Sequence, residues 1–201
     1  MNQQIKAYLS SKDDILQPIL AKLSWKPVKS TNNVFHDLMS CIIEQQIHYR
    51  SSKKKFAKLL AAAALEELTP ESFEVFEQAA LPSVKLSARK YETMARTLDF
   101  FQNKQTDWQA MENDEVRNIL SNIKGIGPWT IDMILMYTLE RPDILPKGDH
   151  HLKGIIAKLY ELDPSRTVAS EIQRIGKNWS PYASTAVQCL WAWQKSSSLR
   201  D

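Results

Sequence analysis

The stretch LSNIKGIGPWTIDMILMYTL, residues 120–139, decides how this chain is expected to fold. The chain has only five glycines, yet Gly125 and Gly127 stand here on either side of one isoleucine, directly before Pro128. Glycine tolerates positive φ and lets another backbone come close, and proline suits the first position of a helix. We therefore predict a tight hairpin between two helices, with Ile126 filling their junction.

Apolar residues recur at helical spacing on both sides of this hairpin, so both helices are expected to dock on a core. The tip between them would present few side chains and several amide N–H groups beside Lys124. Such a tip suits a phosphate group. A plain turn between two helices is the alternative interpretation of the same residues.

Helical spacing extends through nearly the whole chain, and we find no alternating pattern of a β-strand. Ser87, Thr69-Pro70 and Asn113 stand where caps of three helices are expected. The prediction is an all-α fold of two helical lobes, a terminal lobe of residues 1–33 plus 141–201 and a central lobe of residues 34–140. The helices are expected at residues 3–9, 12–23, 34–47, 51–67, 70–79, 87–103, 113–122, 128–140, 149–160, 167–177 and 181–195.

Composition sets outer limits on function. The 201 residues carry 26 Lys and Arg against 23 Asp and Glu, and this net charge of +3 permits an anionic partner without demanding one. Cys41 and Cys189 lie in apolar helical patterns and are expected to be buried free thiols. Two cysteines cannot supply a four-thiolate zinc site or an iron–sulfur cluster. With no signal peptide and no apolar run of ~20 residues, we expect a cytoplasmic protein.

Taken in order, several motifs resemble one known family. IKGIGPWTIDMIL followed by ILPKGDHHLKGI resembles the hairpin and trailing aspartate of the helix-hairpin-helix DNA glycosylase superfamily, most of all its 3-methyladenine DNA glycosylase II branch. LMSCIIEQQIHYRSS, VKLSARKYETMA and NWSPYASTAVQCLWAW extend the likeness over residues 34–195. The resemblance implies a two-lobed helical fold with its active-site cleft between the lobes. It also implies a monomer that acts on double-stranded DNA containing alkylated bases.

Asp149 follows Gly127 by 22 residues and precedes an apolar helix. By residue type and position we expect it to cap that helix, and a cap alone is the simpler interpretation. The resemblance implies that Asp149 is also the catalytic carboxylate, which would stabilise positive charge at the sugar C1′ and orient the attacking water. Asp132 is a rival carboxylate, which we expect to be a partly solvated surface residue.

Trp129 stands where bifunctional members of the superfamily carry a nucleophilic lysine. Tryptophan cannot form an imine with the sugar, so lyase activity is not expected. Its indole would instead stack on an extruded, positively charged base, although core packing is the alternative. The resemblance implies further pocket residues in Met133, Gln45 and His151, and it implies Gln46 as the wedge that fills the gap left by the flipped base. A plain polar helix end explains Gln45 equally well.

The resemblance also implies contacts to the DNA backbone and a cation site. We expect no required cofactor. His150 and His151 are interpreted as residues that flank the cleft, because no further metal ligands stand at suitable spacing. The basic run RSSKKKF, residues 50–56, is either a solvated face or a second phosphate contact. The expected phosphate-binding residues are Lys124, Gly125, Gly127, Trp129, Ser51 and Lys90. A sodium or potassium ion would be held by backbone carbonyls of Ser121, Ile123 and Ile126.

These features lead to one functional hypothesis and two rivals. The hypothesis is a monofunctional DNA glycosylase that flips out an alkylated purine and hydrolyses its N-glycosidic bond with the help of Asp149. The first rival is a non-catalytic helix-hairpin-helix DNA-binding module in which Asp149 is only a cap. The second is an unrelated helical interaction protein.

Overall fold

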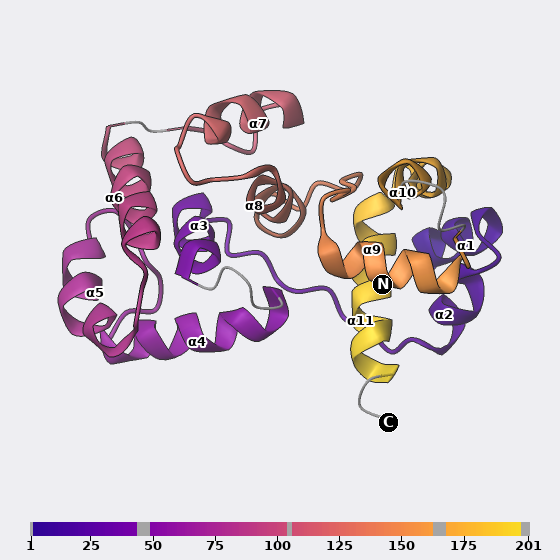
Figure 1. Ribbon diagram of the computed structural model, residues 1–201, viewed down its shortest axis with the longest axis horizontal. Coiled ribbons are helices and arrows are strands. Elements are labelled where there is room, and N and C mark those ends of the chain that lie inside the picture. Colours follow the sequence, from indigo (N-terminus) through magenta and orange to yellow (C-terminus); the bar gives the residue numbers. More distant parts are fainter. Residues whose placement is uncertain (1, 44–48, 104–105, 163–167, 198–201) are drawn as a thin grey trace. The chain divides into compact units, whose positions relative to one another are not determined.

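The computed structural model describes residues 2–43, 49–103, 106–162 and 168–197, with the backbone alone for residues 49–54 and 197. Within these ranges all regular structure is helical, which confirms the all-α prediction (Figure 1). None of the described helices is long and apolar enough to span a bilayer. The chain divides into a terminal unit, residues 1–29 with 135–201, and a central unit, residues 30–134. The boundaries expected from the sequence lie after residues 33 and 140.

The central unit is organised around one buried helix. Helix α3 is buried along its whole length because it packs against α6 and α4. Aromatic rings join the neighbouring helices in this core: Phe35 lies 6.5 Å from Phe73, and Phe56 lies 5.6 Å from Phe76, between ring centroids. The elements are α3 (Val34–Ile43), α4 (Tyr49–Ala62), α5 (Phe73–Ala79), the 3-10 turn η1 (Leu81–Ser83), α6 (Ala88–Gln102), α7 (Asn113–Ser121) and α8 (Pro128–Met133).

Two of the three predicted helix starts in this unit need correction. Ser87 caps α6 as expected. Helix α5, however, begins three residues after Pro70, because Thr69 and Ser72 form a turn through reciprocal side-chain hydrogen bonds. Helix α7 is capped by Glu112 rather than Asn113, since Glu112 and Glu115 form a capping box.

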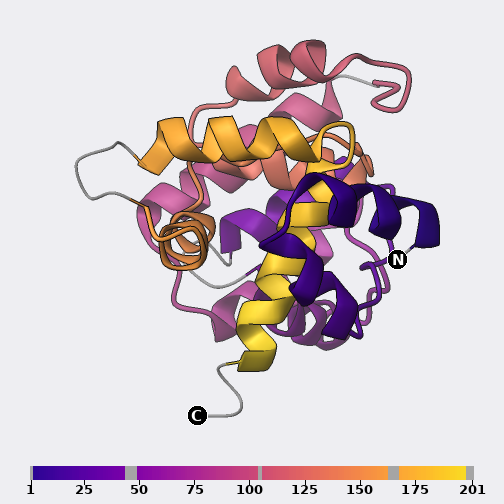
Figure 2. The same cartoon turned by 90° about the vertical axis from the view of Figure 1, so that its right-hand side faces the viewer.

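The terminal unit brings the two ends of the chain together. Helix α11 packs against α2 and crosses α9 (Figures 1 and 2). Tyr137 stacks on buried Trp191 with ring centroids 6.5 Å apart, and Cys189, like Cys41 of the central unit, is a buried free thiol as predicted. The elements are α1 (Gln3–Lys12), α2 (Leu16–Lys22), α9 (His150–Leu159), α10 (Val168–Gly176), the 3-10 turn η3 (Lys177–Trp179) and α11 (Ala183–Ser197).

The helix predicted over residues 128–140 changes its winding halfway. After α8 ends at Met133, residues Ile134–Thr138 form a π-helical segment, η2, at the boundary between the two units. Short π-helical segments are rare and are found mostly at functional sites. Every residue from Thr130 to Leu139 is buried.

A single buried carboxylate, that of Asp13, joins three segments of the terminal unit. Its Oδ1 accepts hydrogen bonds from the backbone N–H groups of Ile15 and Leu16, at 3.0 and 2.9 Å, at the start of α2. Its Oδ2 accepts from the indole N–H of Trp179 at 2.7 Å and from the hydroxyl of Tyr160. Trp179 is fully buried. The N-terminal helices are therefore fastened to the end of α9 and to η3 by one side chain.

The Tyr160–Asp13 hydrogen bond predicts how stability depends on alkaline pH. Burial, followed by the hydrogen bond to Asp13 and its charge, raises the pKa of Tyr160 above its ordinary value. A tyrosine whose pKa is raised in the folded state contributes its full stabilisation at pH values below its unfolded-state pKa, which is about 10. This contribution to stability is lost as the pH rises above 10, because the unfolded state then loses its proton first. In urea unfolding, Tyr160→Phe should lower the free energy of unfolding by about 1.5–3 kcal/mol at neutral pH. The difference in free energy of unfolding between wild type and Tyr160→Phe should shrink by about 1.4 kcal/mol per pH unit above pH 10. A gap that stays constant from neutral pH to pH 11 would contradict this interpretation.

Candidate functional site

The hairpin lies where the sequence predicts it, between α7 and α8. The backbone N–H of Ile123 donates to the carbonyl of Leu120 at 3.1 Å, and that of Ile126 donates to the carbonyl of Ile123 at 3.0 Å, so the chain turns within a few residues. Ile123 and Ile126 are both buried beneath the turn. The prediction that Ile126 fills the junction of the two helices is thereby confirmed, and the polar tip is left to residues 124, 125 and 127.

The two glycines of the hairpin serve different purposes. Gly125 has φ +108°, and a Cβ placed on it would lie 2.2 Å from Oγ1 of Thr93 on α6. Gly127 has an extended backbone with φ −101°, and no described atom lies within 4 Å of the position of its missing Cβ. The positive φ that glycine tolerates is therefore adopted by Gly125 and not by Gly127. What glycine provides at position 127 is open space in front of the backbone.

An ion pair fastens the two hairpin helices to each other. Arg117 of α7 places Nη2 2.7 Å from Oδ1 of Asp132 on α8. Asp132 is only 7% exposed, so the expectation of a partly solvated surface residue is wrong. The sequence shows a charged residue at position 132, but it does not show that α7 places the guanidinium of Arg117 opposite this carboxylate. This carboxylate serves to hold the hairpin together.

Trp129 and Met133 are four residues apart and thus share one face of the α8 segment. Trp129 is half-buried, whereas Met133 is fully buried. This face therefore leads from the surface at the hairpin tip into the interior. The roles of both residues in a base pocket remain predictions.

Asp149 caps α9, as its position in the sequence predicts. Its Oδ1 accepts a hydrogen bond from the backbone N–H of Leu152 at 2.6 Å, and its own N–H donates to the carbonyl of Pro146 at 2.9 Å. The side chain is only 4% exposed. Backbone groups on both sides thus fix the position of the carboxylate and leave it little freedom to rotate.

The segment that leads to Asp149 is fastened to the C-terminal helices by residues that sequence analysis did not single out. Ser184 of α11 accepts a hydrogen bond from the backbone N–H of Ile144 at 2.9 Å and donates one to the carbonyl of Arg141 at 2.6 Å. Leu145 packs onto Gly176, where a Cβ would lie 2.4 Å from one of its methyl groups. The only signal in the sequence is Gly176 itself, a glycine at the end of an amphipathic helix. These contacts fix the approach to the carboxylate.

The structure also describes the surroundings of the adjacent histidines and of one carbonyl of the predicted cation site. His150 and His151 are exposed with ring centroids 6.1 Å apart, and the described residues include no group of three acidic, histidine or cysteine side chains that could hold a metal. The carbonyl of Ile123 already accepts the Ile126 N–H, but a carbonyl oxygen has a second lone pair that suits a sodium or potassium ion. The cation site formed with Ser121 and Ile126 remains a prediction.

The predicted contacts on the α3–α4 side are only partly described. Lys90 donates from Nζ to the carbonyl of Ile43 at 2.9 Å, so it stabilises the C-terminal end of α3. Gln45 and Gln46 lie outside the described residues, as does the side chain of Ser51. Lys124 is exposed at the hairpin tip. The phosphate and wedge roles of these residues remain predictions.

Comparisons with known proteins show which chains this one is similar to. No family model matches the chain. It is 26% identical over 187 residues to YfjP of Bacillus subtilis, a protein with a provisional name as a DNA-3-methyladenine glycosylase; the match covers 88% of this chain but only 64% of that relative. The crystal structure of a DNA-3-methyladenine glycosidase from Bacillus halodurans superposes with a TM-score of 0.73 and 25% identity, covering 99% of this chain and 91% of the other. The 3-methyladenine DNA glycosylase of Schizosaccharomyces pombe, solved with abasic DNA, shares the fold with a TM-score of 0.78, 21% identity and 97% coverage of each chain.

The contrast between the two hairpin glycines can be tested by stability measurements. Gly125→Ala combines a disfavoured φ with a collision against Thr93, whose hydroxyl is held by the carbonyl of Arg89. It should lower the free energy of unfolding by about 2–4 kcal/mol. Gly127→Ala meets no described atom and should lower it by no more than about 1 kcal/mol, as a change at a helix N-cap. Equal losses in urea unfolding would contradict the different purposes assigned to the two glycines.

Proposed function

We propose that this chain is a DNA glycosylase of the helix-hairpin-helix superfamily and that it excises alkylated purines of the 3-methyladenine type from double-stranded DNA. The observation that carries the proposal is the buried, backbone-fixed carboxylate of Asp149, which follows a hairpin whose tip is open at Gly127. The reaction would be hydrolysis of the N-glycosidic bond, with a free base and an abasic site as its products.

The hairpin would bind the DNA backbone. Among the described residues, the amide N–H groups of Gly125 and Gly127 donate to no protein acceptor. Amide groups at a helix N-terminus, next to the exposed ammonium group of Lys124, suit a phosphate. The open space at Gly127 would let the phosphate reach these amides. The Arg117–Asp132 ion pair and the Gly125–Thr93 contact would hold the amides in place before DNA binds.

Trp129 would contact the damaged base. An alkylated purine carries positive charge, and the face of an indole attracts a nearby cation by about 0.5–2 kcal/mol. Trp129 is half-buried at the start of α8, so part of its ring is available. Because tryptophan has no amine, this position cannot form a covalent imine with the sugar. The proposed enzyme is therefore monofunctional, without lyase activity.

Asp149 would support the chemical step. As the bond between C1′ and the base nitrogen breaks, its electron pair leaves with the base, which thereby loses its positive charge. Positive charge then develops at C1′, and a fixed carboxylate stabilises it. Water attacks C1′ and its proton passes to the carboxylate or to solvent. The hydrogen bond from Leu152 fixes one carboxylate oxygen, which reduces the reorganisation that this step requires.

The capping role of Asp149 also favours one rival function. Because the cap alone accounts for an aspartate at this position, a DNA-binding module without catalytic activity would need the same residue. Asparagine is as good a cap as aspartate but cannot carry the negative charge. The substitution Asp149→Asn therefore separates the two roles.

Release of 3-methyladenine from methylated duplex DNA tests the catalytic proposal. Wild type should release the free base, and Asp149→Asn should do so at least about 100-fold more slowly, the effect expected for loss of one transition-state stabilising group. Binding curves should be unchanged, because the cap and the hairpin are retained. If wild type binds DNA and releases no damaged base, the chain is a binding module. If Asp149→Asn is as active as wild type, Asp149 is not catalytic.

Binding to undamaged duplex DNA tests the hairpin separately from the chemistry. Gly127→Ala should weaken binding at least about tenfold, equivalent to 1.4 kcal/mol, because its methyl group occupies the space that the phosphate needs. The matched control is Gly154→Ala on α9, where no described atom lies within 4 Å of the added Cβ. That variant should bind DNA like wild type. Equal binding by wild type and Gly127→Ala would exclude the close approach at position 127.

A further inference from the structure

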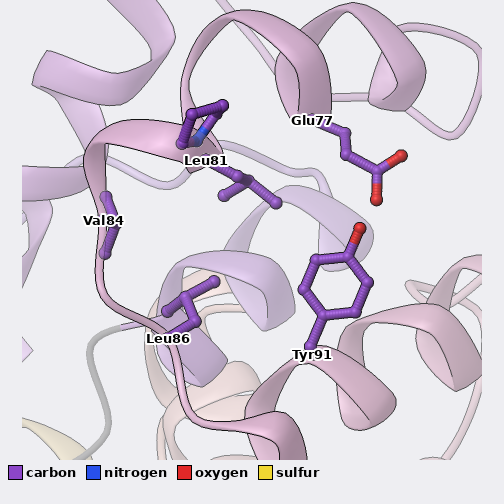
Figure 3. A pocket seen from close by; sticks show the side chains of 6 residues that line it. Glu77, Leu81, Val84, Leu86 and Tyr91 are labelled. Atoms are coloured by element: carbon purple, nitrogen blue, oxygen red, sulfur yellow. The ribbon is translucent and has the colours of Figure 1, made fainter.

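The central unit has a pocket that the proposed reaction does not use. It is a cavity of about 290 Å³ formed by α5, the η1 turn and the start of α6 (Figure 3). Leu81, Val84 and Leu86 supply apolar walls, with Pro82 beside them. This volume lies at the lower end of the range for ligand pockets and suits one long side chain better than a drug-sized molecule.

Two polar groups at this pocket have no protein partner in the described part of the chain. The carboxylate of Glu77 on α5 and the hydroxyl of Tyr91 on α6 point toward each other across the pocket (Figure 3). Neither forms a hydrogen bond or an ion pair with another described residue. Tyr91 is 43% exposed, one of few large apolar side chains at the described surface. A carboxylate and a phenolic oxygen can both accept hydrogen bonds, so an occupant with two or more N–H donors suits this pair.

A guanidinium or ammonium group on an aliphatic stem meets all these requirements. Its N–H groups would donate to the Glu77 carboxylate and to the Tyr91 oxygen. The face of the Tyr91 ring attracts a cation. Long basic side chains bury their methylene groups on apolar surface while the charge stays at the edge, and Leu81 and Leu86 offer such a surface.

The charge around the pocket favours an extended basic partner over a single small amine. Between Lys58 and Lys85 the chain has no lysine or arginine. On the other side of the pocket, Lys85 and Arg89 are exposed, so the acidic character belongs to α5 and the turn before it. Such a surface repels DNA phosphates and attracts a cationic peptide. The acidic residues of this stretch are Glu66, Glu67, Glu71, Glu74 and Glu77.

The pocket and the hairpin use different sides of α6. Thr93 faces Gly125 of the hairpin, whereas Tyr91 lines the pocket. Residues two positions apart on an α-helix point about 160° apart around the helix axis. A partner in the pocket therefore leaves the hairpin tip accessible.

We propose that this pocket is a docking site for a basic peptide segment of a partner protein, with one arginine or lysine side chain inserted between Glu77 and Tyr91. The acidic stretch on α5 binds the remaining basic residues of the segment. This site is independent of the proposed glycosylase activity, and it holds for a DNA-binding module as well.

The full chain and a labelled peptide, acetyl-Gly-Arg-Leu-Arg-Leu-Arg-Gly-amide, test the proposal. Fluorescence anisotropy should show saturable binding that weakens at least about tenfold in Glu77→Gln, which removes the half-buried carboxylate of the proposed charge pair. Tyr91→Ala should weaken it as well. Asp114→Asn removes the same charge from an exposed site outside the pocket and should bind like wild type. Thermal unfolding of each variant verifies that it is folded.

Three results would overturn the proposal. One is equal weakening by Glu77→Gln and Asp114→Asn, which would mean attraction to overall charge alone. The second is equal binding of a peptide with citrulline in place of arginine, since citrulline keeps the shape without the charge. The third is binding of the peptide by Tyr91→Ala as tightly as by wild type, which would place the peptide outside the pocket.

Discussion

The hairpin depends on the absence of a side chain at Gly125. Its backbone, at φ +108°, passes so close to Thr93 that a single methyl group would overlap the threonine hydroxyl. Thr93 cannot turn away freely, because β-branched side chains are stiff and its hydroxyl donates to the carbonyl of Arg89. Helix α6 therefore determines where the turn runs, while the buried Ile126 and the Arg117–Asp132 ion pair determine how α7 and α8 leave it.

The sequence predicts the helices and the hairpin well because both depend on local patterns. It predicts contacts poorly where two distant segments meet. In the sequence, nothing distinguishes Gly125 from Gly127. Only the contact with Thr93, 32 residues before Gly125, shows that the fold requires a glycine at position 125, whereas position 127 has space for a side chain. Asp132 is misjudged for the same reason, since its partner Arg117 lies on another helix. The end of α8 is also missed, because a π-helical segment keeps the same apolar character as an α-helix.

Asp149 shows how far residue type and position can lead without a structure. The capping role follows from an aspartate before an apolar helix, and the hydrogen bond to Leu152 confirms it. The contacts that fix the preceding segment, through Ser184 and through Leu145 on Gly176, could not be predicted, because they join residues some 30 to 40 positions apart. A cap and a catalyst need the same property, a carboxylate with little freedom to move. The capping role is therefore compatible with the proposed chemistry, although it does not by itself require it.

The central unit separates its charges in a way that suits two partners at once. The hairpin tip offers amide groups and Lys124, which favour an anion, whereas α5 and the turn before it carry only acidic charges. Helix α6 contributes to both regions, with Thr93 on one side and Tyr91 on the other. A cation that enters the pocket is thus drawn to a surface that DNA avoids. This arrangement lets a basic partner bind without competing for the phosphate site on which the proposed repair function depends.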